Sequence, residues 1–241
     1  MARPSWLDWP RHLAGATSRN PLDAPARDRR SCLMPDEPAT SDYFVPAPRV
    51  EAGWLLCRRV EPGDDDAVYE AIAASMEHLR PWMPWAEGYT LEKAKEFVAR
   101  NVARPDTPAV PEASYLACTR EGTLLGVCGL HARLGPGALE IGYWVDVRHT
   151  RQGVATLAAA ALTELALASP GVDVVEIHHD RANRASGAIP ARLGYELVAA
   201  VEDDANAPGE EGIELQWRTT SAAWPASAGA RLLEQARAAT T

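Results

Sequence analysis

An apolar strand, a short basic loop and a long Ala/Leu helix follow one another between residues 139 and 168. The strand pattern covers 139–147, the loop reads Arg-His-Thr-Arg-Gln-Gly over 148–153, and the helical pattern runs over 154–168 until Pro170 and Gly171 close it. A strand that leads directly into a helix is typical of proteins in which sheets and helices share one core. The chain is therefore predicted to fold as a mixed α/β domain.

Turn residues separate further strand and helix patterns along the chain. The predicted strands cover 54–60, 114–119, 123–132, 139–147, 172–179, 196–201 and 212–218, and the predicted helices cover 64–79, 90–100, 154–168 and 186–193. These patterns place one domain at residues 53–220, with no internal repeat.

The two ends of the chain differ from this domain in composition. The first fifty residues hold 8 of the 19 prolines and follow no regular period. Residues 1–52 are therefore predicted to be a flexible N-terminal extension, of which residues 1–33 lie upstream of a native start at Met34. Residues 221–241 are predicted to form a C-terminal tail or helix.

Composition excludes several classes of protein. With 24 basic and 33 acidic residues, the net charge of −9 argues against nucleic-acid or membrane-surface binding. The apolar run at 154–168 is too short to cross a bilayer, and the N-terminus lacks a secretory signal, so a cytoplasmic location is expected. The four cysteines show no CxxC spacing and are predicted to be free, packed thiols. Only two basic residues are lysines, Lys93 and Lys95, which indicates a GC-rich bacterial origin.

The loop at 148–153 has the chemistry of an anion site. Free N–H groups at the start of a helix and its positive dipole end attract phosphate, and Gly153 lets a pyrophosphate approach closely. Arg148 and Arg151 add positive charge beside it. The loop matches neither a Walker A sequence nor GxGxxG. An ordinary strand-to-helix turn with solvated arginines is the alternative.

Several motifs of the chain resemble those of the GNAT acyltransferase superfamily, and within it the RimJ/RimL-type branch of protein N-terminal acetyltransferases. They are Glu-Ile-Gly-Tyr-Trp-Val at 140–145, Arg-Gln-Gly-Val-Ala-Thr at 151–156, Asn-Arg-Ala-Ser at 183–186, Leu-Gly-Tyr at 193–195 and Leu-Arg-Pro-Trp-Met-Pro-Trp at 79–85. The resemblance implies a twisted, mostly antiparallel sheet of about seven strands, split near its middle and flanked by about four helices. It also implies that acetyl-CoA binds at the split, with no metal.

The same resemblance assigns residues to the acetyl-CoA site. Backbone groups from 144 to 147 would pair with the pantetheine arm, N–H groups from 151 to 156 would hold the pyrophosphate, and Asn183 would meet the pantetheine near the thiol. The implied cofactor-binding residues are Trp144, Val145, Val147, Arg151, Gln152, Gly153, Val154, Ala155, Thr156 and Asn183. Thr150 departs from the family pattern, which commonly has Arg or Gln there.

Two residues are predicted to be catalytic. Glu140 lies within an apolar strand, where loss of solvent raises the pKa of a carboxyl toward that of a general base, acting through water. The alternative is a side chain in solvent or an ion pair with Arg133. Many relatives have a tyrosine acid where this chain has Pro190, so Ser186 is predicted to protonate the leaving thiolate. Pro190 is tolerable if the helix begins at Ser186 or Gly187.

The acceptor site is less defined by the sequence. Arg80, Trp82, Trp85 and His178 are predicted to bind the substrate, although the tryptophans are equally typical of core caps. His178 and His179 face opposite sides of a strand, so no metal site is predicted.

The predicted function is transfer of an acetyl group from acetyl-CoA directly to a primary amine, for which a protein N-terminal α-amine is one acceptor. The alternatives are a small amine such as an antibiotic, amino acid or polyamine, and succinyl transfer, for which Arg80 or Arg181 would bind the acyl carboxylate. A non-catalytic CoA-binding module is the alternative of another class. Either a monomer or a homodimer is compatible with the sequence.

Overall fold

The computed structural model describes residues 47–104 and 112–240. The strands of the described residues are β1 (Arg49–Ala52), β2 (Leu55–Arg59), β3 (Ala113–Thr119), β4 (Leu124–His131), β5 (Ala138–Val145), β6 (Val174–Asp180), β7 (Glu196–Glu202) and β8 (Ile213–Thr220). The α-helices are α1 (Asp65–Ala74), α2 (Met76–Leu79), α3 (Leu91–Val102), α4 (Val154–Leu167), α5 (Arg184–Leu193) and α6 (Ala228–Ala238). Short 3₁₀ turns cover Pro84–Ala86, Val147–His149 and Trp224–Ala226.

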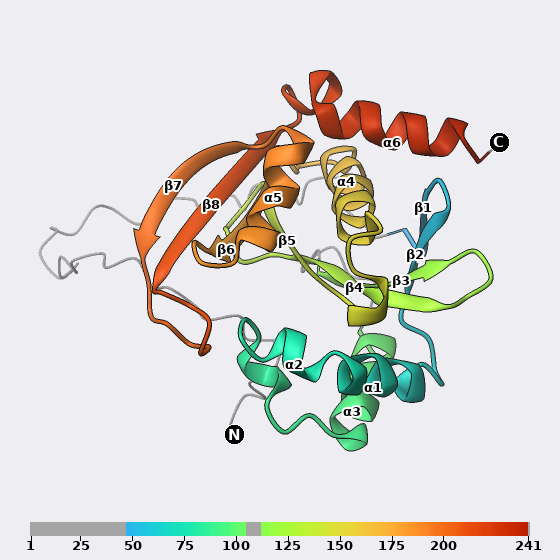
Figure 1. Ribbon diagram of the computed structural model, residues 1–241. Helices are drawn as coiled ribbons and strands as arrows, with labels where there is room; N and C mark the ends of the chain where they lie inside the picture. Colours follow the sequence, from blue (N-terminus) through green and yellow to red (C-terminus); the bar gives the residue numbers. More distant parts are fainter. Residues whose placement is uncertain (1–46, 105–111, 241) are drawn as a thin grey trace, which may run out of the picture.

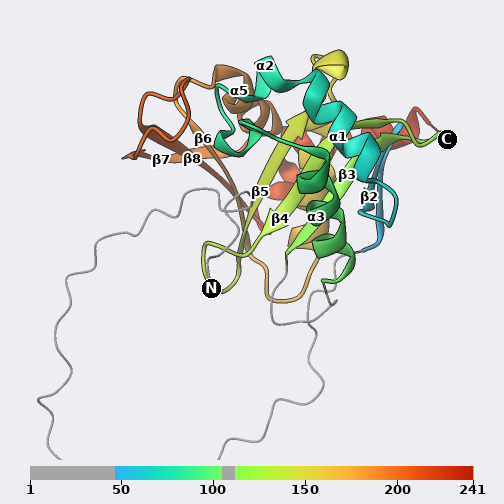
Figure 2. The ribbon, with the colours of Figure 1, turned by 90° about the horizontal axis from the view of Figure 1, so that it is seen from below.

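One sheet runs through the molecule in the order β1-β2-β3-β4-β5-β6-β8-β7. Every neighbouring pair is antiparallel except β5 and β6, which are parallel. Figure 1 shows α4, α5 and α6 on one face of this sheet and α1, α2 and α3 on the other, and Figure 2 shows the second face from below. The predicted mixed α/β fold with a mostly antiparallel sheet is confirmed, with eight strands in place of about seven.

Each face of the sheet has its own core. On the first face, the Ala/Leu helix α4 is buried on nearly all sides, because strands lie beneath it and α5 and α6 cover it. Ala159, Ala160 and Leu162 are fully buried there. On the second face, Val68 of α1 and Phe97 of α3 pack against strands β3 and β4. No helix in the described part of the chain is long and apolar enough to span a membrane.

Several predicted boundaries shift in the structure. Strand β1 lies within the residues predicted to be an N-terminal extension, and it pairs with β2 through a turn at Gly53, whose φ is +67°. Residues 1–46 of that predicted extension, including the predicted upstream segment 1–33, lie outside the described residues. The helix predicted over 64–79 is two helices, because the chain turns at the buried Ser75.

The C-terminal residues form a helix that packs on its own domain. Leu233 of α6 is fully buried in the core of the first face, where α6 covers α4. The Arg237 Nη1 atom lies 2.6 Å from the Glu164 Oε1 atom of α4. Together with the division at Ser75, this brings the number of α-helices to six among the described residues, compared with the four predicted.

Candidate functional site

Strands β5 and β6 separate part of the way along their length. Their parallel pairing covers only Ala138–Glu140 of β5 and Val174–Glu176 of β6. Beyond that point the two strands diverge (Figure 1). A cavity of about 590 Å³ lies between them and the helices beside them. Its walls come from both strands, from the start of α4, from α5 and from the segment around Trp82 and Met83. The predicted split near the middle of the sheet is therefore present.

The start of α4 forms one end of this cavity. Gly153 adopts a left-handed conformation with φ +86° and carries no side chain to cap the helix. Val154, Ala155 and Thr156 line the cavity, and their N–H groups belong to the first turn, which has no acceptor within the helix. Arg151, with φ +62°, lines the cavity beside them. A phosphate-bearing ligand fits this end, because N–H groups and positive charge converge there.

Arg148 does not belong to this anion site. Its guanidinium is held by the buried carboxylate of Asp146, with Nε 3.0 Å from Oδ1 and Nη2 2.5 Å from Oδ2. The salt bridge anchors the loop rather than presenting free charge. Of the two arginines predicted to add charge, only Arg151 lines the cavity.

Most residues predicted to bind the cofactor line the cavity, but two do not. Trp144, Val145 and Asn183 contribute to its wall. Val147 does not, because its N–H donates to the Ser75 Oγ atom at 2.9 Å and its carbonyl accepts from the Thr150 hydroxyl. Gln152 is exposed and lies outside the wall, and its side-chain amide points to the Arg148 carbonyl at 3.5 Å. Val147 and Gln152 therefore lie outside the cavity wall, and both backbone groups of Val147 already have partners.

Glu140 lies at the point where β5 and β6 separate. Alternation along β5 places it on the face of Trp144, toward α1 and α3, because Leu139 and Ile141 belong to the opposite core. The side chain is buried, and the Arg133 Nη1 atom lies 3.8 Å from its Oε1 atom. Burial raises the pKa of Glu140 above its ordinary value, and the charges of Arg133 and His178 act against that rise. Glu140 is therefore a buried carboxylate, as predicted, and it also forms the ion pair with Arg133 that was the alternative.

His178 carries a positive charge beside this carboxylate. Its Nε2 atom lies 2.5 Å from Glu176 Oε2, and its Nδ1 atom lies 3.3 Å from Glu214 Oε1. Burial by itself lowers the pKa of His178, but the hydrogen bonds to the two carboxylates outweigh it and raise the pKa to about 10. His178 lines the cavity as predicted, in its cationic form.

His179 faces the other side of β6. Its Nδ1 atom donates to the Asp180 carbonyl at 2.7 Å, and its Nε2 atom accepts from the Trp217 indole at 3.0 Å. Burial lowers the pKa of His179, so the ring is neutral with both nitrogens bonded. The two histidines do not converge, and no cluster of metal-ligating residues occurs among the described residues.

Ser186 and Tyr143 form a hydroxyl pair at the opposite wall of the cavity. Helix α5 begins at Arg184, where the Asn183 Oδ1 atom caps the Ser186 N–H at 3.1 Å. Pro190 therefore lies in the interior of the helix and not in its first turn, as had been predicted. Because proline has no N–H, it cannot donate to the Ser186 carbonyl one turn earlier. The Tyr143 hydroxyl donates to that carbonyl at 3.1 Å and lies 3.3 Å from the Ser186 Oγ atom.

Tyr143 lies within the motif at 140–145, but the sequence did not predict a role for its hydroxyl. Burial raises the pKa of its hydroxyl, so Tyr143 stays protonated and retains its donor. The sequence did contain an indirect signal, because a proline four residues after Ser186 leaves a helix carbonyl in need of another donor.

The predicted acceptor residues divide between two locations. Trp82 lines the large cavity. Trp85 contacts Tyr89 and Trp144, with ring centroids 5.7 and 6.3 Å apart, over the second face of the sheet. Arg80 lines neither cavity, and its Nε atom pairs with Glu87 at 2.8 Å. Arg181 pairs with Glu211 at 2.6 Å and also lies outside, so neither arginine is placed to bind an acyl carboxylate.

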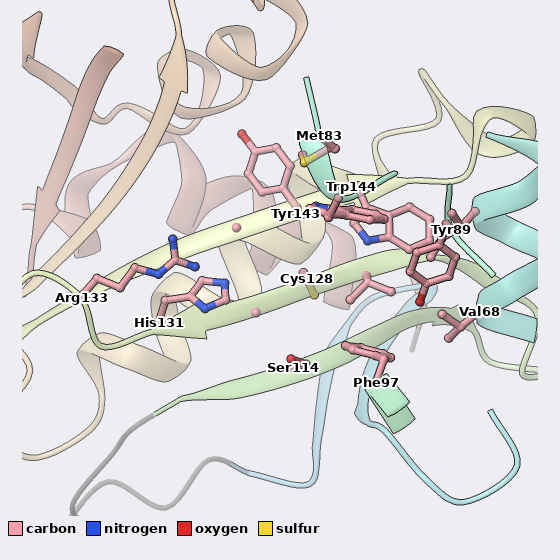
Figure 3. Close-up of a pocket in the computed structure, with 15 residues that line it drawn as sticks. Val68, Met83, Tyr89, Phe97, Ser114, Cys128, His131, Arg133, Tyr143 and Trp144 are labelled. Atoms are coloured by element: carbon pink, nitrogen blue, oxygen red, sulfur yellow. The ribbon is translucent and has the colours of Figure 1, made fainter. Parts of the chain in front are cut away.

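A second, smaller cavity of about 100 Å³ lies between the sheet and helices α1 and α3. Figure 3 shows Val68, Tyr89 and Phe97 at one end of it and His131 and Arg133 at the other. Gly142, Tyr143, Trp144 and Met83 line both cavities, so the two share a wall at the split.

Comparisons with known proteins agree with this fold and site. Residues 55–196, more than half of the chain, match the family model described as an acetyltransferase (GNAT) domain. A comparison with curated protein sequences gives no match.

Solved structures with the same fold include two described as RimL and RimJ. The first is RimL, a ribosomal L7/L12 alpha-N-protein acetyltransferase in complex with coenzyme A; its TM-score is 0.63 at 19% identity, over 71% of this chain and 97% of that one. The second is Mycobacterium smegmatis RimJ in complex with CoA-disulfide; its TM-score is 0.65 at 23% identity, over 78% of this chain and 92% of that one.

A third solved structure is the microcin C7 self-immunity acetyltransferase MccE in complex with acetyl-CoA and AMP. Its TM-score is 0.62 at 14% identity, over 69% of this chain and 92% of that one. At these identities the likeness of the three structures concerns the fold.

Proposed function

The chain belongs to the GNAT acetyltransferase family, and we propose that it moves the acetyl group of acetyl-CoA to the α-amine of a peptide or protein N-terminus. One observation supports this site most strongly: the unpaired edge of β5 and the uncapped start of α4 belong to the same cavity. An extended arm that ends in a pyrophosphate matches such a cavity, because the strand edge offers N–H and C=O groups and the helix start binds anions.

Different residues around the cavity would bind different parts of acetyl-CoA. The N–H groups of Val154, Ala155 and Thr156 together with Arg151 would hold the pyrophosphate. Backbone groups of Trp144 and Val145 would pair with the pantetheine amides. When bound, acetyl-CoA supplies a thioester whose carbonyl carbon is open to attack by an amine.

Glu140 acts as the general base in this proposal. Its side chain reaches the cavity on the face of α1 and α3, beside the Trp82 segment. A carboxylate with a raised pKa accepts the proton of the attacking amine, directly or through water, more readily than an exposed one. The charges of Arg133 and His178 oppose the rise in its pKa and favour its ionised form.

Ser186 acts as the proton donor to the departing sulfur. Its hydroxyl lies on the cavity wall at the start of α5, and Tyr143 fixes its position through contacts with both Ser186 oxygens. Tyr143 is thus a positioning residue for this step.

The acidic groups of the cavity support an amine acceptor. Glu140, Asp180 and Glu210 line it, and a cationic ammonium is attracted by such carboxylates. The RimL and RimJ structures, whose fold this chain shares, support a protein α-amine over a small amine.

A panel of acceptors tests this proposal. Full-length protein and acetyl-CoA are incubated with peptides beginning in Ser, Ala or Met, with N-terminally blocked peptides that contain lysine, and with spermidine, an aminoglycoside and free amino acids. The proposal expects acetylation of the free peptide N-termini. Faster acetylation of a small amine overturns the acceptor assignment, and binding of acetyl-CoA without transfer to any amine supports the non-catalytic module.

A pair of variants tests the base. Glu140→Gln is expected to lower kcat by about 100-fold or more, because general-base catalysis contributes about 10²–10⁴. Glu196→Gln, on the exposed strand β7, removes a carboxylate of the same kind as a control. Equal rates for Glu140→Gln and the wild type at saturating acceptor would remove Glu140 from the mechanism.

A further inference from the structure

We propose that the smaller cavity is an acyl pocket, through which the enzyme also transfers uncharged acyl chains of three or four carbons, such as propionyl, butyryl and isobutyryl. This inference rests on the proposed function, because it assigns the acyl donor to the large cavity. It concerns the carbon atoms of a longer acyl chain that extend beyond the two carbons of an acetyl group.

Two glycines form the floor of this pocket. Gly129 of β4 and Gly142 of β5 are paired directly across the two strands, so neither strand has a side chain at this pair, and the His131 ring borders it. A Cβ atom on Gly142 would lie 3.1 Å from the His131 Nε2 atom, and one on Gly129 would lie 3.0 Å from the Ala113 carbonyl oxygen. Larger residues at these positions would close the hollow.

Apolar side chains of the helices form the roof. Val68 and Ile72 of α1 and Phe97 of α3 line the cavity from the helices. Figure 3 shows Val68 and Phe97 at the end opposite His131. Its volume is about 100 Å³. An apolar cavity of about 150 Å³ in another protein binds benzene, so this smaller one matches a chain of about three or four carbon atoms.

The pocket begins where the thioester would lie. Gly142, Tyr143 and Trp144 line both cavities, and the Tyr143 hydroxyl contacts Ser186, the proposed donor to the leaving sulfur. Neighbouring strands are about 4.8 Å apart, so a chain that passes from the free edge of β5 over Gly142 to β4 spans only a few carbon–carbon bonds. A longer acyl group therefore reaches the hollow from the split.

The charges around the pocket select an uncharged chain. Burial and the charges of Arg133 and Arg104 lower the pKa of His131 to about 3, so its ring is neutral. Arg133 lies at the same end, but Glu140 faces it at 3.8 Å. A terminal carboxylate, as in succinyl, would lose its water and would be repelled by Glu140, which already shares the charge of Arg133.

The reaction is the same as for acetyl. The amine nitrogen forms a bond to the acyl carbon, the carbon–sulfur bond breaks and its electron pair leaves with the sulfur, the amine loses one proton, and the sulfur gains one. The products are an N-acyl amide and free CoA.

The test compares acyl donors with one peptide acceptor. Acetyl-, propionyl-, butyryl-, isobutyryl- and succinyl-CoA are each assayed with the full-length protein by mass spectrometry of the product. The expected result is transfer of acetyl and of the short uncharged chains, with succinyl much slower.

Two filling variants locate the effect. Ser114→Ile fills the pocket from β3 and Val68→Phe fills it from α1, and each is expected to lower the butyryl-to-acetyl ratio of kcat/KM by tenfold or more, since one methylene in a pocket is worth about 10–200-fold. Ser114→Ala, which removes the hydroxyl without filling space, is the matched control and keeps the ratio. Circular dichroism and thermal unfolding establish that each variant is folded.

The outcomes separate this inference from the proposed function. Transfer of acetyl alone, preference for succinyl, or a ratio unchanged in both folded filling variants overturns the acyl pocket and leaves acetyl transfer standing. Transfer from none of the five donors overturns the proposed function itself.

Discussion

Pro190 and Tyr143, which lie on different elements, are coupled through a single carbonyl oxygen. The proline withholds a backbone donor from the Ser186 carbonyl in α5, and the tyrosine hydroxyl on β5 supplies one at 3.1 Å. A carbonyl that is removed from water and has no donor costs free energy. The Tyr143 hydroxyl therefore makes Pro190 tolerable, and Pro190 makes the Tyr143 hydroxyl necessary. The same contact places the Ser186 hydroxyl at the cavity wall.

A double-mutant cycle measures this coupling. Tyr143→Phe is expected to lower the free energy of unfolding by about 1–3 kcal/mol, because the partly buried Ser186 carbonyl loses its donor. In the Pro190→Ala background, the alanine N–H satisfies the Ser186 carbonyl, and the same substitution should cost about 1 kcal/mol less. Urea unfolding of the four proteins gives the coupling, and additive effects would show that the hydroxyl does not substitute for the missing helix donor.

The charge of Arg133 sets the pH range in which Glu140 can act. Burial raises the pKa of Glu140, and Arg133 opposes the rise. In Arg133→Gln the pKa of Glu140 should rise further, so the acid limb of the kcat/KM profile should move to higher pH, because a base works only when deprotonated. Arg120→Gln removes a surface guanidinium that pairs with Glu51 and serves as the control. An acid limb at the same pH in all three proteins would contradict the assignment.

At the scale of elements, the junction of β5 with α4 connects the fold to the site. The strand continues past its last pairing with β6, the loop is anchored by Asp146 and by the Ser75 contact of Val147, and the helix starts at a left-handed glycine. Since α4 is buried on nearly all sides, the direction of its free N–H groups is fixed by the core.

Two glycines with the same backbone strain allow a matched test of that junction. Gly153 and Gly63 have φ of +86° and +95°, and a Cβ at either would meet nothing within 4 Å. Alanine at each should therefore cost about 1–2 kcal/mol of stability through the left-handed conformation alone. Only Gly153→Ala should also weaken acetyl-CoA binding in isothermal titration, because it shifts the N–H groups of α4. Equal affinities in the two variants would place the pyrophosphate elsewhere.

For the molecule as a whole, His131 and His178, two partly buried histidines of the second face, make stability depend on pH in opposite directions. The pKa of His131 is about 3, below the ordinary 6.5, so its contribution is complete above pH 6.5 and is lost as the pH falls toward 3. The pKa of His178 is about 10, so its contribution is complete below pH 6.5 and is lost as the pH rises toward 10.

The free energy of unfolding is therefore expected to be highest near pH 6.5. Urea unfolding across pH 4 to 9.5 should show a decline on both sides, with the alkaline decline absent in His178→Gln and the acid decline reduced in His131→Phe. Unchanged slopes in these variants would assign the pH dependence to other groups.

Much of the fold and part of the site were predictable from the sequence. The strands, the long helix and the glycine loop have local signatures in period and turn residues, so their order was predictable. Strand β1 was missed because it is four residues long and follows an irregular segment. The pairing of Tyr143 with Ser186, the Val147 contact with Ser75 and the cavity over Gly129 and Gly142 join residues distant in the chain, and no local pattern encodes such contacts.

Tandem mass spectrometry of a single acetylation product tests whether the protein acetylates an α-amine at the split. A peptide with a free N-terminus and an internal lysine is incubated with acetyl-CoA and either the wild type or Glu140→Gln. Transfer at the split predicts one acetyl group on the α-nitrogen with the wild type and at most about one hundredth of that rate with the variant. No acetylated peptide with the wild type, or acetyl groups on lysine alone, would contradict acetylation of an α-amine by this protein.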